Sequence, residues 1–154
     1  MLSDEDFYAR LAEEARILEV EEPGFKPIKN DLKHWLGFIL GSGTYDKGVF
    51  QIEIKISRKF PFEAPSFWWK TKIFHPNIIN ERICIGVFNK DWVPTMTISG
   101  LIEAVRVLLN YPNPKSPLNH KAAKLLKEDK EKYQETVKEY IEKYATWDAL
   151  DKKK

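Results

Sequence analysis

Hydrophobic residues recur at helical spacing near the start of this chain. Over residues 6–22 they form one stripe among charged residues, which predicts an amphipathic helix. Ser3 or Asp4 is suited to cap this helix, because both side chains can accept a hydrogen bond from a free backbone amide. A Pro-Gly pair at positions 23–24 ends it. The stripe consists of Phe7, Leu11, Ala15 and Leu18.

Three runs rich in branched and aromatic residues follow and are typical of β-strands. They cover residues 35–40, 49–57 and 67–70, and the second alternates in part between apolar and polar positions. Glycine-rich segments between the first two runs indicate a hairpin turn. A helix followed by consecutive strands with short links predicts an α+β fold that contains an antiparallel meander.

The periodic pattern stops over residues 74–97. Neither a helical nor a strand period fits this stretch, which contains His75, Pro76, Asn77 and Cys84. A long irregular segment inside a compact domain is usually functional. Candidate chemistry is therefore expected here.

Helical spacing returns in the C-terminal third. Residues 99–110 carry one apolar helix face after a capping residue, Thr97 or Ser99, and prolines close this helix. Residues 121–145 form a longer amphipathic region that predicts two helices. The chain shows no internal repeat, so we predict one domain over residues 1–150 and a short charged tail at residues 151–154.

Composition narrows the function classes. Hydrophobic residues make up 43% of the chain and charged residues 31%, which is typical of a folded globular protein. The net charge of +2 is too small to indicate a nucleic-acid or membrane partner. One cysteine and three histidines argue against a structural zinc site. A lone cysteine forms no internal disulfide, which favours the cytoplasm or a eukaryotic nucleus, and nothing requires more than a monomer.

Cys84 has two interpretations. Flanked by Ile83 and Ile85, it fits a buried core position, which is the commoner place for such a cysteine. The irregular segment around it favours a reactive thiol instead, as do Asn77 before it and Gly86 after it. The amide of Asn77 is suited to donate to an oxyanion, and a glycine allows another chain to come close.

His75 offers a rival interpretation, because a cysteine–histidine pair is a common way to activate a thiol. A histidine before a proline more often shapes a turn, so a structural role is the simpler prediction. The aromatic residues at positions 60–74 could instead stack on bases, but no arginine-rich stripe accompanies them. Packing against a sheet explains them better.

Four motifs occur in order along the chain. They are TKIFHPNI at 71–78, IC at 83–84, WVPTMTI at 92–98 and LLNYPNPKSPLN at 108–119. An FPFEAP stretch at 60–65 precedes them. In this order and at this spacing they resemble the ubiquitin-conjugating enzymes, the E2 family. The similarity extends from about Arg10 to Ala145, so the chain resembles a member that consists of the core domain alone.

The resemblance implies the α+β fold of that family, the UBC fold, with a four-stranded antiparallel meander between an N-terminal helix and C-terminal helices. It places a fourth strand near residues 72–73 and a cis peptide bond between Phe60 and Pro61. It also implies an acyltransferase. Cys84 would accept ubiquitin or a ubiquitin-like protein from an activating enzyme as a thioester. The modifier would then pass to a target lysine with a RING-type ligase, or to a ligase cysteine.

The resemblance assigns roles to residues near the thiol. Those matching Asn77 and Ser116 assist Cys84 in catalysis, and those matching His75 and Pro76 support the active site. No metal or cofactor is implied for the protein itself, because the activating enzyme consumes the ATP.

Partner surfaces are implied in the same way. Phe62, Pro94 and Thr95 match two loops that bind RING-type or HECT-type ligases. Arg10 matches a basic residue of the first helix, which binds the activating enzyme. The two surfaces overlap in the family, so these partners are expected to exclude each other.

The chain also departs from the family pattern. Gly86 and Ser116 stand where many relatives have acidic residues that help to orient and deprotonate the incoming lysine. Glu13 and Glu14 make the first helix less basic than usual. These differences indicate a divergent member, archaeal or otherwise prokaryotic. The alternative is a non-catalytic scaffold that binds ligases or ubiquitin-like proteins, although such variants typically lack the cysteine.

Overall fold

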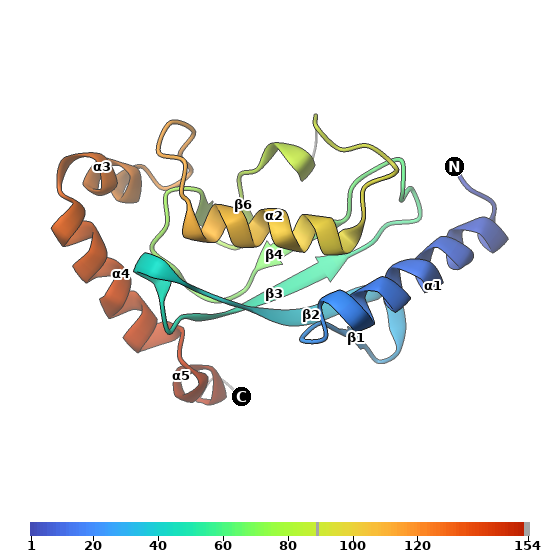
Figure 1. Cartoon of the computed structure of the whole chain (residues 1–154), viewed down its shortest axis with the longest axis horizontal. Coiled ribbons are helices and arrows are strands. Elements are labelled where there is room, and N and C mark those ends of the chain that lie inside the picture. The colour runs from blue at the N-terminus through green and yellow to red at the C-terminus, as the bar shows by residue number, and fades with distance from the viewer. Residues whose placement is uncertain (89, 153–154) are drawn as a thin grey trace.

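The computed structural model describes residues 1–88 and 90–152. One helix precedes a four-stranded sheet and further helices follow it (Figure 1), which confirms the predicted α+β fold. The first helix and the strands are α1 (Asp4–Glu21), β1 (Lys26–Ile28), β2 (Asp31–Leu40), β3 (Val49–Lys55) and β4 (Ser66–Trp69). The later helices are α2 (Ile98–Asn110), α3 (His120–Glu128), α4 (Lys130–Tyr144) and α5 (Trp147–Asp151).

The sheet is an antiparallel meander in the order β1-β2-β3-β4. Its fourth strand is β1, so the strand expected near residues 72–73 was wrongly placed. Beyond β4, the backbone amide of Gln51 in β3 donates to the side-chain hydroxyl of Thr71 at 2.8 Å. The hydroxyl takes the place of a backbone carbonyl, so the hydrogen-bond ladder between β3 and β4 ends there. β1 escaped prediction because it is a short edge strand that contains Pro27 and shows no alternating pattern.

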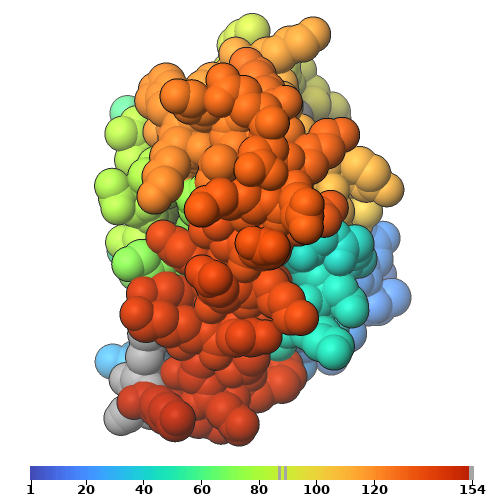
Figure 2. All heavy atoms as spheres, turned by 90° about the vertical axis from the view of Figure 1, so that its left-hand side faces the viewer, coloured from blue at the N-terminus to red at the C-terminus, as the bar shows by residue number. Residues whose placement is uncertain are grey.

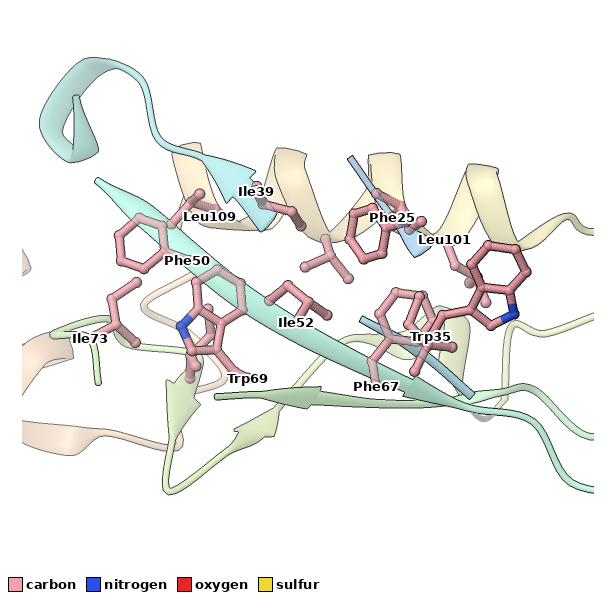
Figure 3. Close-up of a cluster of buried hydrophobic side chains, with 14 of the residues drawn as sticks. Phe25, Trp35, Ile39, Phe50, Ile52, Phe67, Trp69, Ile73, Leu101 and Leu109 are labelled. Atoms are coloured by element: carbon pink, nitrogen blue, oxygen red, sulfur yellow. The ribbon is translucent and has the colours of Figure 1, made fainter. Parts of the chain in front are cut away.

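The core lies between α2 and one face of the sheet (Figure 3). Every second residue of β2 and β3 points to this face, and Ile39 pairs with Phe50 across the two strands. Leu101 and Leu109 of α2 pack against them. The apolar residues that recur at strand period in β2 and β3 therefore pack in one buried layer with those that recur at helical period in α2.

Both N-terminal caps were among the predicted candidates. Ser3 accepts a hydrogen bond from the amide of Asp6 at 3.1 Å and caps α1. Thr97 accepts from the amide of Gly100 at 3.0 Å and caps α2. Each helix begins directly after its capping residue, so these side chains set the two helix starts.

The peptide bond between Phe60 and Pro61 is cis, as the resemblance implied. It lies in the connection between β3 and β4. Phe60 is buried in the core while Phe62 is exposed. The connection therefore anchors one aromatic ring and presents the other at the surface.

The amphipathic region of residues 121–145 divides into two helices, α3 and α4, as predicted. Asp129 lies between α3 and α4 and caps the second by accepting from the amide of Lys132 at 3.1 Å. Figure 2 shows these helices covering one end of the molecule, beside the turn η1 (Gly43–Tyr45). α5 includes residue 151 of the predicted tail, and residues 153–154 lie outside the described part. Among the helices described, none is long and apolar enough to cross a membrane.

Candidate active site

The predicted irregular segment contains a small surface hairpin. β5 (Ile78–Ile79) pairs antiparallel with β6 (Arg82–Ile83). Asn80 and Glu81 form the turn with positive φ angles of 51° and 68°, a backbone that matches the twist of a two-residue hairpin. The amide of Trp69 donates to the carbonyl of Glu81 at 3.0 Å and anchors the hairpin to β4.

Cys84 follows this hairpin directly, and it is exposed. Its amide donates to the carbonyl of Asn77 at 2.9 Å, so the hairpin ladder sets the cysteine beside this residue. Cys84, Asn77 and Ser116 line one open cavity of about 600 Å³. The interpretation of Cys84 as a buried core residue is therefore wrong. Ile83 and Ile85 are half-buried, and the extended chain between them turns Cys84 outward.

Asn77 is buried, and its side chain holds the loop of residues 113–116. Oδ1 accepts from the amide of Asn113 at 2.8 Å, and Nδ2 donates to the carbonyls of Asn113 and Ser116 at 2.8 and 3.1 Å. A side-chain amide has two N–H donors, and both are used here. Asn77 therefore braces the loop. Donation to an oxyanion, the role suggested by the sequence, requires one of these bonds to open.

Pro76 connects the hairpin to the same loop. Its carbonyl accepts from the amides of Leu118 and Asn119 at 2.8 and 2.9 Å. Ser116 is exposed at the cavity. Backbone and side-chain bonds from one short motif thus bring a distant loop to the thiol. Within residues 1–88 and 90–152, no three His, Cys, Asp or Glu side chains gather as a metal site.

His75 is fully buried, and both of its ring nitrogens are bonded to the backbone. Nδ1 accepts from the amide of Asn77 at 3.0 Å, and Nε2 lies 2.9 Å from the carbonyl of Leu108. This pattern fits a neutral ring with its hydrogen on Nε2. Burial lowers the pKa of His75 to about 4, so the ring is uncharged at neutral pH. These bonds give His75 a structural role and leave the cysteine–histidine pair without support.

We expect His75 to make stability depend on pH between about 6.5 and about 4. The folded chain keeps the ring neutral with a pKa of about 4, whereas the unfolded chain takes up a proton below the ordinary histidine pKa of 6.5. The unfolded state therefore binds more protons in this window. The free energy of unfolding is fully retained above the window and falls as the pH falls, by up to about 3 kcal/mol. Urea denaturation at a series of pH values measures it.

Two variants serve as controls for this pH effect. His75→Gln is expected to be less stable at neutral pH and to lack this part of the slope. His120→Gln is expected to keep the slope, because His120 is exposed at the start of α3. Parallel pH profiles for the wild type and His75→Gln would contradict the assignment.

The two loops predicted to bind ligases are tied together. The indole Nε1 of Trp92 donates to the carbonyl of Pro61 at 2.7 Å. This bond links the segment before Pro94 to the connection that carries Phe62. Phe62, Pro94 and Thr95 are all exposed. The structure therefore brings these three residues to neighbouring loops at the surface.

Arg10 lies in the same region and contacts one of those loops. Its guanidinium donates to the carbonyls of Pro94 and Met96, both at 2.8 Å, and its Nε donates to Glu14 at 3.3 Å. The guanidinium also lies over the ring of Phe60, 5.0 Å from the ring centre. These contacts join α1 to the Pro94 loop. Arg10 thus connects the helix predicted to bind the activating enzyme with a loop predicted to bind ligases.

Glu14 supports this region, a role not predicted from the sequence. It occupies the buried stripe of α1 together with Phe7, Leu11 and Leu18. Its carboxylate accepts from the amide of Ile98 at 2.7 Å, where α2 begins and backbone amides lack helical partners. The signal was its place on the apolar stripe, because a carboxylate at a core position needs a partner.

Replacing Glu14 by alanine is expected to lower the free energy of unfolding by about 3 kcal/mol. The change leaves the Ile98 amide and the Arg10 guanidinium without their shared partner at a buried site. Glu14→Gln keeps one acceptor and is expected to lose less. Urea denaturation compares both with Glu13→Ala, a matched control because Glu13 is exposed and pairs with Arg16 on the surface. Equal urea midpoints for Glu14→Ala and the wild type would show that Glu14 makes no net contribution to stability.

The strands, the hairpin and the loops that build this site all lie within the region matched by one protein-family model. A family model described as ubiquitin-conjugating enzyme matches residues 10–141, from within α1 to near the end of α4. The matched region contains the whole sheet, the hairpin and every residue that lines the cavity with Cys84. The α+β architecture found here is consistent with the UBC fold of that family. The chain belongs to the ubiquitin-conjugating enzyme family.

Proposed function

We propose that this protein is an E2 that carries ubiquitin or a ubiquitin-like protein as a thioester on Cys84. The main support is the exposed thiol in an open cavity shared with Asn77 and Ser116. A protein tail needs an open approach, and a sulfur sealed in the core could not react with it. Membership of the family supports conjugation chemistry in general.

The proposed reaction exchanges one thioester for another. The Cys84 thiolate attacks the carbonyl carbon of the modifier's C-terminal glycine, which arrives as a thioester on the activating enzyme. The C–S bond to Cys84 forms, the bond to the donor cysteine breaks, and the donor leaves as a thiolate. The acyl group keeps its activation for the next transfer. ATP is consumed by the activating enzyme, so the E2 itself needs no cofactor.

Transfer from Cys84 uses the ligase loops. The exposed Phe62, Pro94 and Thr95 form the proposed docking surface for a RING-type ligase, which brings a target lysine to the thioester. Transfer to a ligase cysteine is the other route. Arg10 contacts the Pro94 loop from α1. The activating enzyme and the ligase therefore compete for adjoining surfaces.

A charging assay tests the proposal. The protein is mixed with the activating enzyme, the modifier and ATP of the same source, and the products are separated without reducing agent. The expected result is an adduct whose mass is that of both proteins less one water and which disappears with thiol reagents. Prior alkylation of the cysteine is expected to prevent it. A protein that binds a ligase but never forms the adduct would instead be a non-catalytic scaffold.

The proposed chemistry also sets the conditions for the protein. Cys84 must stay reduced to react, so we place the protein in a reducing compartment such as the cytoplasm. It acts there as a monomer, and its substrates are proteins with accessible lysines.

A further inference from the structure

A lysine that approaches a Cys84 thioester meets a cavity whose described lining residues include no carboxylate. Among the described residues of this lining, the charged side chains are those of Arg82 and Lys90, both positive. A lysine amine has a pKa of about 10.4 in solution and is therefore an ammonium ion at neutral pH. Positive neighbours disfavour its approach, and its nitrogen cannot attack before it loses a proton. A negative group at the rim of the cavity would attract the ammonium ion, and it would accept the proton that the nitrogen sheds as it attacks.

Asp91 places a carboxylate beside Gly86, a residue of the cavity lining. Its amide donates to the carbonyl of Gly86 at 3.1 Å, which closes the loop after Cys84. Its Oδ2 lies so close to Gly86 that a Cβ added there would come within 3.0 Å of it. Gly86 itself lines the cavity together with Cys84. The absence of a side chain at position 86 therefore makes room for the carboxylate of Asp91.

We propose that Asp91 is a catalytic residue for transfer to lysine, a role that rests on the conjugating function proposed above. Its carboxylate binds the lysine head group at the mouth of the cavity and orients the nitrogen toward the thioester carbon. The ammonium ion first loses a proton to water. The neutral nitrogen then attacks the carbonyl carbon, the C–N bond forms, and the C–S bond breaks to leave the Cys84 thiolate. The proton that the nitrogen sheds passes to Asp91 and then to solvent.

The two roles of Asp91 can be separated, because its backbone closes the loop and its side chain carries the charge. Asp91→Asn keeps the amide bond to Gly86 and nearly the same shape while it removes the charge. If Asp91 only closes the loop, Asp91→Asn is expected to discharge its thioester at the wild-type rate. If Asp91 is catalytic, the discharge rate is expected to fall only with acceptors that attack through an amine.

Single-turnover discharge of the Cys84 thioester tests the role of the Asp91 charge. The Cys84 thioester is formed first on the wild type, on Asp91→Asn and on Asp46→Asn, and the activating enzyme is then stopped. Asp46 is an exposed aspartate that lines a different cavity, so it controls for net charge. Discharge is followed with free lysine and with β-mercaptoethanol over a range of pH.

We expect Asp91→Asn to slow discharge to lysine by about tenfold at neutral pH, as when a charge-assisted hydrogen bond to the attacking group is lost. The difference shrinks as the pH approaches the pKa of the amine, since less ammonium then remains. Discharge to the thiol and the rate of charging stay unchanged. Asp46→Asn behaves as the wild type with both acceptors.

A second set of variants tests whether the carboxylate must lie beside residue 86. Gly86→Ala is expected to displace the Asp91 carboxylate and to slow discharge to lysine, but to add little when Asp91 is already Asn. Asp91→Ala removes the side chain that a Cβ at position 86 would meet, so Gly86→Asp combined with Asp91→Ala returns a carboxylate beside the cavity and is expected to recover most of the lost rate. A double variant no faster than Asp91→Ala would overturn the assignment.

The outcomes separate this inference from the function on which it rests. If no thioester forms on the wild type, both are wrong. If the thioester forms and Asp91→Asn discharges to lysine as fast as the wild type, the role of Asp91 alone is wrong. Equal slowing with lysine and with the thiol would also overturn it, because the loss would then come from the loop.

Discussion

Cys84→Ala is expected to form no adduct with the modifier under conditions that fully charge the wild type. Cys84 is the one cysteine in the chain, so no other thiol in this protein can take its place. The side chain is exposed beside the hairpin, so its removal disturbs no core contact and folding is expected to survive. Non-reducing electrophoresis and intact mass measure the adduct, and thermal unfolding checks the fold.

Cys84→Ser is the matched variant for this prediction. Its hydroxyl can form an oxygen ester, which reducing agents do not cleave, although a hydroxyl is the weaker nucleophile. Slow formation of an adduct that survives thiol reagents therefore locates the acyl group on residue 84. A thiol-sensitive adduct that persists in Cys84→Ala would place the bond elsewhere and remove the basis of the proposed function.

Asn77→Ala is expected to have the second largest effect, on stability and on transfer together. The three side-chain hydrogen bonds of Asn77 disappear, and the backbone of residues 113–116 loses its buried partners. The expected loss of unfolding free energy is about 2–4 kcal/mol. Discharge of the Cys84 thioester is expected to slow by about a hundredfold, because Ser116 is no longer held at the cavity. Urea denaturation and single-turnover discharge measure the two effects.

Amide hydrogen exchange shows how Asn77 acts. If it braces the loop, Asn77→Ala exposes the amide of Asn113, whose hydrogen now bonds to Oδ1 of Asn77, and exchange there becomes faster. If discharge is lost while that amide stays protected, the Asn77 amide acts on the oxyanion directly. Gln134→Ala is the control, since it removes an exposed side-chain amide on α4 and is expected to change neither property.

The helices α1 to α4 could be predicted well because each has a regular apolar stripe, whereas the five residues of α5 are too few to show one. The caps at Ser3 and Thr97 were predictable for the same reason, since short-range chemistry determines a helix start. The edge strand β1 could not be predicted, because a strand of this kind is defined by pairing with β2 and not by its own three residues. The strand expected near residues 72–73 failed similarly, because the Thr71 hydroxyl ends the ladder there.

The sequence predicted which residues belong to the site but not how they are arranged. Motif order pointed to Cys84, Asn77 and Ser116, and the cavity contains all three. The flanking isoleucines alone favoured a buried Cys84, whereas the irregular segment favoured a reactive thiol, and His75 stayed open as its base. The exposed cysteine after the surface hairpin agrees with the reactive thiol, and the backbone bonds of His75 argue against a role as base.

The sequence by itself determined the helices α1 to α4, the strands β2 to β4, the single thiol and the family pattern, because periodicity and motif spacing are local properties. Tertiary structure decided which side chains reach solvent and which distant groups meet. The exposure of Cys84, the hold of Asn77 on residues 113–116 and the approach of Asp91 to Gly86 all depend on how segments pack. Such contacts arise between surfaces that form only after the chain has folded, so no local pattern encodes them.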